Sequence, residues 1–199
     1  SNLTSGDGGV TWTATLTPTA DVEDTSNLVT LDNTGVVDAA GNAGAGTTDS
    51  SNYAVDTLRP TASIVVADTA LAAGETSSVT IPFNEAVSGL GVTDFSVTNG
   101  ALSNLTSSDG GVTWTATLTP TADVEDTSNL VTLDNTGVQD AAGNTGVGTT
   151  DSNNYAVDTL RPTASIVVAD TALAAGESST VTITFNEAVS GLDVADCSV

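Results

Sequence analysis

The residues best suited to chemistry are carboxylates and amides that gather in short loops. Segment 123–126 (Asp-Val-Glu-Asp) places three carboxylates within four residues, and segment 140–144 (Asp-Ala-Ala-Gly-Asn) joins an acid to an amide around a glycine that permits a tight turn. Both strings occur a second time, at 21–24 and 38–42. Oxygen ligands without nitrogen or sulfur partners favour calcium over zinc or copper. These loops are therefore candidate calcium ligands.

A simpler interpretation of each loop stands beside the metal one. Asp and Asn form good turns without any ion, so a single loop is explained equally well by its backbone geometry. Neither loop has the EF-hand pattern, and the glycine-rich nonapeptide of calcium-binding β-rolls does not occur in the sequence. The placement of all the acids on the fold has to decide between the two interpretations.

Composition excludes several functional classes. The chain has 199 residues with 25 acidic and 2 basic side chains, a formal charge of −23, no histidine and one cysteine. Such a polyanion does not neutralise phosphates, so we expect no nucleic-acid partner. Catalytic triads that need histidine, an intrachain disulfide and a cysteine-rich zinc site are all excluded. No apolar run approaches the roughly 20 residues of a membrane span, so we expect no membrane insertion of this segment.

A repeat of 102 residues organises the chain. Aligning residues 1–97 with 103–199 gives 97 pairs, of which 11 differ and 86 are identical. Each unit ends near an Asp-Thr-Leu-Arg-Pro string, where the proline cannot continue a strand ladder. We therefore expect residues 1–56 to be the C-terminal part of one unit, 57–158 a complete unit and 159–199 the N-terminal part of a third. Head-to-tail contact between chains, with the tail of one completing the head of the next, is a hypothesis from this division.

Within the complete unit, apolar residues alternate with Thr, Ser or Asn, which predicts strands. Seven segments show this pattern, and Gly, Asp, Asn and Ser turns separate them; they are 64–66, 79–83, 95–97, 102–105, 112–118, 130–133 and 155–157. The pattern predicts an all-β fold, with tandem immunoglobulin-like β-sandwich repeats of about seven strands each. Phe83 and Trp114 are expected to fill the core. Cys197, which stands where the other copy has Phe95, is expected to be a buried and inert thiol.

When the strands alternate up and down, all 12 acidic residues of the complete unit fall in loops or at strand ends. Six lie at each of the two ends of the unit, which we call its poles. The pole toward the next unit would carry Asp68, Glu75, Asp123, Glu125, Asp126 and Asp158. The other pole would carry Glu85, Asp94, Asp109, Asp134, Asp140 and Asp151. Two carboxylates about 5 Å apart repel by roughly 3 kcal/mol at an effective dielectric constant of 20. Arg59 and Arg161, in the two linkers, can each pair with one acid, which leaves most of the charge for a divalent cation to neutralise.

The strings FNEAVSGLGVTDFSV, SSDGGVTWTATLTP, QDAAGN and NNYAVDTLRPT resemble the bacterial immunoglobulin-like repeats of giant repeats-in-toxin adhesins, and the likeness covers the whole chain. The resemblance implies an extracellular extender region on a bacterial cell surface, which projects a distal binding domain and is stiffened by calcium near the domain junctions. It implies ligand positions at Asp38, Asn42, Asp56, Glu85, Asp94, Asp140, Asn144 and Asp158. The Asp-Cys pair at 196–197 departs from the usual Asp-Phe.

Taken together, the loops, the poles and the resemblance give one set of candidate calcium ligands. The set is Asp21, Glu23, Asp24, Asp38, Asn42, Asp56, Glu85, Asp94, Asp123, Glu125, Asp126, Asp140, Asn144 and Asp158. The expected partners are neighbouring identical repeats of the same chain, and no catalytic residue is expected.

Four other functions compete with this one. A carbohydrate-binding sandwich would need exposed aromatic side chains, and a glycosidase with paired carboxylates has no reason to recur as near-identical units. The alternating threonines of 113–119 resemble an ice-binding face but are also ordinary strand surface. An acid-rich spacer adapted to high salt, with no specific ion sites, is the remaining alternative.

Overall fold

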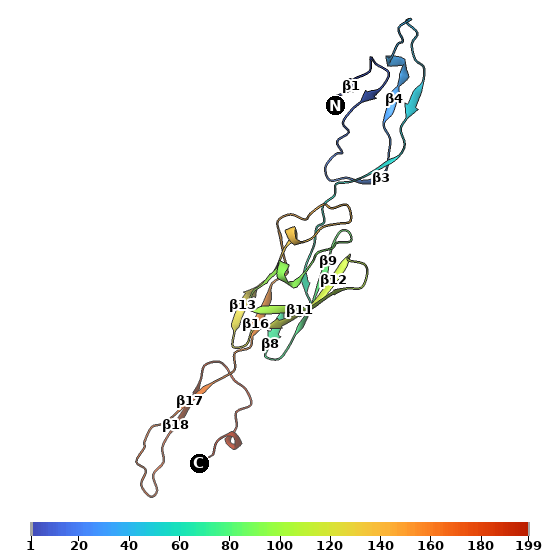
Figure 1. Ribbon diagram of the computed structural model, residues 1–199. Coiled ribbons are helices and arrows are strands. Elements are labelled where there is room, and N and C mark those ends of the chain that lie inside the picture. The colour runs from blue at the N-terminus through green and yellow to red at the C-terminus, as the bar shows by residue number, and fades with distance from the viewer. Residues whose placement is uncertain (1, 199) are drawn as a thin grey trace.

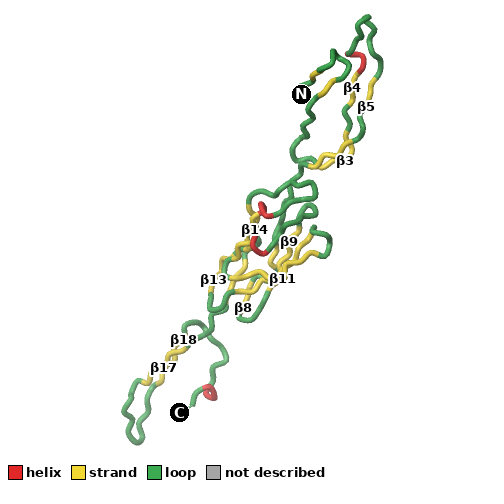
Figure 2. The backbone as a smooth tube through the Cα atoms, viewed as in Figure 1, coloured by secondary structure: helices red, strands yellow, loops and turns green. Residues whose placement is uncertain are grey.

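The computed structural model describes residues 2–198 and contains three consecutive units, with the two chain ends at opposite ends of the molecule (Figure 1). Strands and connecting loops make up nearly all of the described chain, and the helical segments are single 3₁₀ turns (Figure 2). The 3₁₀ turns are η1 (Asn33–Gly35), η2 (Val92–Asp94), η3 (Asn135–Gly137) and η4 (Val194–Asp196). The prediction of an all-β fold is confirmed.

The central unit is a sandwich of three small sheets. Their strand orders are β11-β12-β9-β7, β10-β14-β15 and β13-β16-β8. The strands are β7 (Val65–Val66), β8 (Ala70–Ala72), β9 (Ser77–Pro82), β10 (Phe95–Val97), β11 (Gly100–Ser107), β12 (Thr113–Pro120), β13 (Glu125–Asn129), β14 (Val131–Asp134), β15 (Thr149–Asp151) and β16 (Tyr155–Asp158). All seven predicted segments fall on strands. The other three strands, β8, β13 and β15, are short.

The two flanking units contain fewer paired strands. The first unit has the pairs β1-β2, β3-β6 and β4-β5, and the last unit has the pair β17-β18. Their bounds are β1 (Thr4–Ser5), β2 (Trp12–Thr13), β3 (Glu23–Asn27), β4 (Thr30–Asp32), β5 (Thr47–Asp49), β6 (Tyr53–Asp56), β17 (Ala164–Val168) and β18 (Val181–Phe185).

The core of the central unit follows from the alternation of its strands. Val79 and Ile81 in β9 are fully buried, whereas Ser78, the residue before Val79, is exposed and Thr80, the residue between them, is half-buried. Phe83 is buried, and Trp114 is partly buried against the same apolar cluster, which confirms both as core residues. The Trp114 indole Nε1 also donates to the Gly111 carbonyl at 3.1 Å, so its polar atom is satisfied.

Cys197 is exposed, so the expectation of a buried thiol is wrong. Its counterpart Phe95 packs against the core through the pairing of β10 with β14, where Phe95 lies opposite Leu133. Strand β14 belongs to the second half of its unit, and residues 159–199 supply only a first half. Among residues 2–198, no strand lies opposite position 197 to cover its side chain.

A threonine anchors the chain as it leaves each unit. The Thr57 hydroxyl donates to the Thr19 carbonyl at 2.6 Å and accepts from the Val22 N–H at 3.1 Å. Thr159 repeats the arrangement, donating to the Thr121 carbonyl at 2.7 Å and accepting from the Val124 N–H at 3.0 Å. Each linker therefore begins from a position fixed against the unit it leaves.

Candidate metal centre at the unit junction

The first ligand candidate stands at the end of the first unit. Asp56 is the last residue of β6 and lies opposite Glu23, the first residue of β3, in the strand register. Thr57 follows directly and is held by its hydrogen bonds to the 19–22 turn. The backbone of Asp56 is therefore fixed on both sides, and its carboxylate is presented at the pole that faces the central unit.

The second candidate, Glu85, lies in a loop of the central unit that is hydrogen-bonded to the linker. The neighbouring Asn84 accepts from the Thr61 N–H at 2.6 Å through its Oδ1. Its Nδ2 donates to the Arg59 carbonyl at 3.4 Å and to Glu85 Oε1 at 3.3 Å. Asn84 thus ties the Glu85 carboxylate to the chain segment that enters the unit.

The third candidate, Asp140, is held by its own loop. Asn144 closes the loop by donating from its N–H to Asp140 Oδ1 at 2.8 Å and from its Nδ2 to Asp140 Oδ2 at 2.7 Å. Gly143 takes a φ of 90°, which a side chain would make costly, and this explains the glycine at that position. The same Nδ2 lies 3.3 Å from both Asp56 Oδ1 and the Asp56 carbonyl, so Asn144 bridges the two units.

Together these loops bring three carboxylates to one point. Asp56, Glu85 and Asp140 each offer an oxygen within 4.8 Å of the other two. Asp140 is buried, with 4% of its surface exposed, and the other two are half-buried. One of the acids belongs to the first unit and two belong to the next, so the junction itself assembles the cluster.

The electrostatics of the cluster are uneven. Burial, followed by the negative charges of Asp140, Asp56 and Glu23, raises the pKa of Glu85. Burial also acts to raise the pKa of Asp140, but hydrogen bonds from the Asn144 side chain and from the loop N–H groups outweigh it, and the pKa of Asp140 is lowered. Asp140 therefore holds its charge firmly, and Glu85 is the group that gains most from an added positive charge.

Arg59 does not supply that charge through the expected ion pair. Its Nη1 donates to the Thr145 carbonyl at 2.6 Å, a backbone atom one residue beyond the Asp140 loop. The bond joins the linker to the central unit but leaves the carboxylates unneutralised. The pairing of Arg59 with an acid, expected from the sequence, is replaced by this backbone contact.

The chemistry of the donor set fits a hard divalent cation. Three carboxylates and the Asp56 carbonyl supply oxygen only, and calcium accepts six to eight oxygen ligands in irregular geometry, water included. Asp56, Glu85 and Asp140 would hold such an ion. Glu23, whose charge acts on Glu85, lies at the edge of the same site.

Several other candidates from the sequence lie elsewhere. The 38–42 loop repeats the internal bonds of its counterpart, with the Asn42 N–H and Nδ2 each 2.8 Å from Asp38 oxygens, but it lies at the end of the first unit that faces away from the central unit (Figure 1). Asp94 accepts from the Gly91 N–H at 2.7 Å and packs against Gly137. The sequence pattern did not separate these structural acids from the junction acids.

The acidic strings at 21–24 and 123–126 each run from a turn into the start of a strand, β3 or β13. Asp21 and Asp123 both take a φ of 57°, the left-handed conformation that Asp tolerates. Asp24 Oδ1 accepts from the Ser26 N–H at 2.8 Å. Asp126 accepts from the Ser128 N–H and from Asn99 Nδ2, both at 2.9 Å. From these strings, Glu23 acts on the three-carboxylate cluster through the effect of its charge on Glu85.

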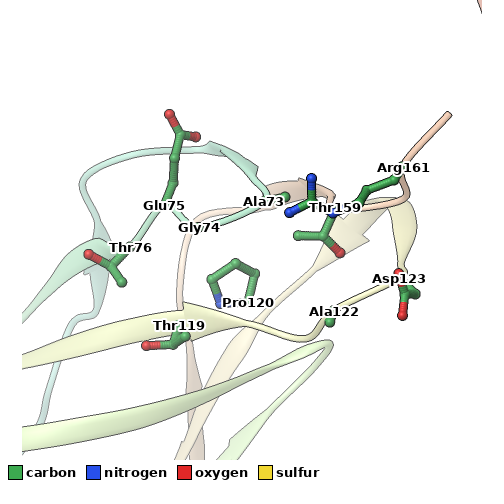
Figure 3. A pocket seen from close by; sticks show the side chains of 10 residues that line it. All are labelled: Ala73, Gly74, Glu75, Thr76, Thr119, Pro120, Ala122, Asp123, Thr159 and Arg161. Carbon is green, nitrogen blue, oxygen red and sulfur yellow. The ribbon is translucent and has the colours of Figure 1, made fainter.

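The opposite pole of the central unit repeats part of the junction. Asp158 lies opposite Glu125 in the register of β16 and β13, as Asp56 lies opposite Glu23. A pocket opens beside it, and Figure 3 shows Glu75, Asp123 and Arg161 among its lining side chains. No third carboxylate joins Asp158 here within residues 2–198 to make a second such cluster.

The sequence reasoning missed Asn84 and Thr57. Asn84 precedes an acid in a loop and looks like any turn residue, because its role depends on a linker that passes beside it in space. Thr57 had a weak signal, its repetition next to the junction aspartate at position 159.

No helix within residues 2–198 has both the length and the apolar character that crossing a membrane requires.

Comparisons with known proteins bear on the family. A search of curated proteins finds no match. A solved structure of FdeC, described as a novel broadly conserved Escherichia coli adhesin eliciting protection against urinary tract infections, aligns with 16% identity and a TM-score of 0.38. The alignment covers 73% of this chain and 46% of that one, so the present chain spans less than half of its length. The family model described as "Bacterial Ig-like domain" matches residues 1–55, 56–157 and 158–199. The chain therefore belongs to the bacterial Ig-like domain family.

Proposed function

We propose that this chain is a structural spacer of a bacterial cell-surface adhesin, in which calcium holds consecutive Ig-like units in line. The observation that carries the proposal is the meeting of Asp56 from one unit with Glu85 and Asp140 from the next, within 4.8 Å. The tandem family matches and the end-to-end succession of units in Figure 1 support a module that spans distance rather than one that catalyses a reaction. The resemblance to repeats of large adhesins supports an extracellular location.

Different residues at the junction fix the acid-bearing segments and connect the two units. Thr57 and Asn84 fix the two chain segments that bear the acids, and Asn144 and Arg59 bridge the units by hydrogen bonds. A bound calcium ion supplies the positive charge that lets the three carboxylates share one point. Calcium sites of extracellular modules bind at about 10⁻⁴ to 10⁻³ M, which suits calcium-rich surroundings outside a cell.

Calcium titration calorimetry of the full chain tests the proposal. Asp140→Asn keeps the shape of the loop and removes one charge, and we expect it to weaken calcium binding at the junction by about tenfold or more. Asp38→Asn is the matched control, since it makes the same change in the same loop sequence away from the junction. Equal binding by both variants, or no saturable binding by the parent chain, contradicts the proposal.

A salt-adapted spacer without specific ion sites is the second candidate, and a separate observation favours it. Many acids lie outside the cluster and accept local hydrogen bonds; Asp109 binds the Thr113 N–H at 2.9 Å, and Asp134 binds the Thr136 N–H at 3.0 Å. For such a spacer, sodium and calcium at equal ionic strength would have the same effect. Saturable heat for calcium alone distinguishes the two functions.

A further inference from the structure

We propose that the Asn99–Gly100 pair is a site of spontaneous chemical modification, suppressed in the folded central unit and active when that unit opens. The reactant is water, and the products are aspartate or isoaspartate at position 99 and free ammonia. Among the asparagines of the sequence, Asn99 is the one that a glycine follows. The reaction needs no metal ion and does not depend on the junction site.

The reaction is an intramolecular substitution followed by hydrolysis. The Gly100 backbone nitrogen attacks Asn99 Cγ, a new C–N bond closes a succinimide ring, and the Cγ–Nδ2 bond breaks. The leaving nitrogen takes up the proton lost from the Gly100 N–H and departs as ammonia. Water then opens the ring, giving aspartate when it adds at Cγ and isoaspartate when it adds at the backbone carbonyl carbon. A glycine after the asparagine favours ring closure because no side chain obstructs the attack.

The fold itself requires this reactive pair. Asn99 lies in the turn between β10 and β11 and takes a φ of 51°, in the left-handed region where Asn is enriched. Gly100 begins β11, and a Cβ at that position would lie 2.9 Å from Leu118 Cδ1 and 3.1 Å from the Thr119 carbonyl oxygen. Leu118 is fully buried, so a larger residue at position 100 would displace a core side chain.

The Asn99 amide also completes a polar cluster beneath the turn. Its Nδ2 donates to Asn129 Oδ1 at 2.7 Å and to Asp126 Oδ2 at 2.9 Å. Asn129 is fully buried, so a donor lost at this place is not readily replaced by bulk water. Position 99 therefore needs a left-handed backbone and an amide donor together, and asparagine supplies both.

The folded turn restrains the rotations that ring closure requires. The Asn99 carbonyl accepts from the Thr121 N–H at 2.9 Å, which fixes the plane of the 99–100 peptide. The bonds from Nδ2 to Asn129 and Asp126 fix the side-chain amide. The peptide or the amide must rotate to bring the Gly100 nitrogen onto Cγ, and either rotation breaks hydrogen bonds of this set. Both residues of the pair are also half-buried, which limits the access of water.

Opening of the central unit removes these restraints. When β10 and β11 separate from their partner strands β14 and β12, the 99–100 pair becomes part of a mobile chain in which ring closure is free to proceed. Pulling on a spacer is one way to open a unit, and a long opening then leaves a permanent chemical mark at position 99.

The mark weakens the unit when it closes again. An ionised aspartate at position 99 has no donor, so the bonds to Asn129 Oδ1 and Asp126 Oδ2 are both lost. Its carboxylate also lies beside that of Asp126, and the two repel. Isoaspartate adds a backbone carbon directly before Gly100, where the backbone packs closely against Leu118 and Thr119. A unit that has reacted therefore opens more readily than before.

Mass spectrometry of the parent chain tests suppression by the fold. The full chain is held in mildly alkaline buffer with or without guanidinium chloride, and fragmentation follows amide loss at each asparagine. Asn99 should convert first in guanidinium and at least about tenfold more slowly in buffer, where the reaction waits for opening. Asn104 is the internal control, since it also has a left-handed φ, of 54°, but precedes leucine. Equal rates at Asn99 in the two solutions, or earlier conversion of another asparagine in guanidinium, overturn the inference.

Asn99→Asp tests the effect of the product on the folded unit. The variant should melt several degrees below the parent chain by circular dichroism. Asn104→Asp is the matched control, because it adds the same charge at an exposed position whose side chain makes one long contact, 3.5 Å to Thr117 Oγ1. The control should melt close to the parent. An Asn99→Asp chain as stable as the control contradicts the weakening assigned to the reaction.

Refolding of aged parent chain gives the same answer without a variant that has to fold. Samples held in guanidinium for increasing times and then diluted should regain a native state whose melting temperature falls in step with the conversion of Asn99. Asn99→Gly accepts the left-handed turn and has no amide to lose, so its melting temperature should not change with time in denaturant. A loss of equal size in Asn99→Gly would assign the ageing to another reaction and reject the site.

Discussion

At the scale of single residues, the carboxylates fall into two groups according to what their oxygens bind. Asp7 accepts from the Thr11 and Val10 N–H groups and the Ser5 hydroxyl, and the Thr11 bond is the main reason that its pKa falls to about 2. Asp109 is arranged in the same way in the next unit. Such acids are stabilised as anions by the turn itself. Glu85 has one amide donor and three acidic neighbours, so its charge is the unfavourable one.

Glu85→Gln tests this difference. The folded pKa of Glu85 is raised, so the folded state binds more protons than the unfolded state, and stability is lost as the pH rises through the folded pKa. In chelator at neutral pH, the variant should therefore melt a few degrees higher than the parent. The gap should close on acidification through the raised pKa, where Glu85 itself becomes neutral.

Calorimetry or circular dichroism across pH measures that gap, and calcium affinity should fall in the same variant. Glu187→Gln is the control, since Glu187 is the counterpart of Glu85 in the last unit and belongs to no such cluster among residues 2–198. A lower melting temperature for Glu85→Gln in chelator at neutral pH would contradict the assignment of repulsion to this residue.

Asn129 is a second residue whose side chain should contribute strongly to stability. It is fully buried; its Nδ2 donates to the carbonyls of Asp126 and Tyr155 at 3.0 Å, and its Oδ1 accepts from Asn99 at 2.7 Å. Asn129→Ala would remove these three hydrogen bonds at a fully buried position and should lower the free energy of unfolding by about 2–4 kcal/mol in urea titration. Asn27→Ala, at the partly exposed counterpart, should cost less; an equal loss would show that burial is not the cause.

At the scale of elements, the linker between units is a braced segment and not a free hinge. Thr57 is tied to the first unit, Pro60 is fully buried, and Arg59 is bonded to the Thr145 carbonyl of the central unit. The chain crosses from one unit to the next with contacts on both sides. The loop that bears Asp140 is thereby fixed in place beside the strand that bears Asp56.

Arg59→Ala removes the bond to the Thr145 carbonyl and should loosen this element. Small-angle scattering in calcium should show a broader distribution of maximum dimensions for the variant than for the parent chain, because the first unit gains freedom to bend. Arg161→Ala makes the same change in the other linker, whose arginine lines the pocket of Figure 3. Should Arg59→Ala give the profile of the parent, its guanidinium bond contributes nothing to alignment.

Much of the fold was predictable from the sequence because burial alone sets strand alternation. The seven predicted segments are strands, while β8 was missed because its three residues bury only Leu71 and show no period. The site was predictable only in part. Repetition and resemblance pointed to Asp56, Glu85 and Asp140, but the same patterns included Asp38 and Asp94. What distinguishes the first three acids from Asp38 and Asp94 is that they meet across a junction between units. No local sequence pattern contains that information.

At the scale of the whole molecule, a formal charge of −23 is spread over consecutive units, and the proposed function makes their alignment depend on calcium. We expect the maximum dimension from small-angle scattering to be shorter, or more widely distributed, in chelator than in calcium. Magnesium at equal ionic strength is the control, since it adapts poorly to irregular ligand sets. Superimposable profiles in calcium and chelator would reject a cation-dependent shape.

The parallel pairing of β8 with β16 has a mechanical consequence. The first and last segments of the central unit run side by side in the same direction, joined by the Ile64–Ser152 bridge, the Asn153 contacts to Val66 and the Ala156 N–H to Thr69 carbonyl bond at 2.8 Å. Tension along the chain enters beside one segment and leaves beside the other, pulling them in opposite directions. These bonds are then sheared together and cannot be unzipped one at a time, so the unit resists stretching most strongly along the line in which it is joined to its neighbours.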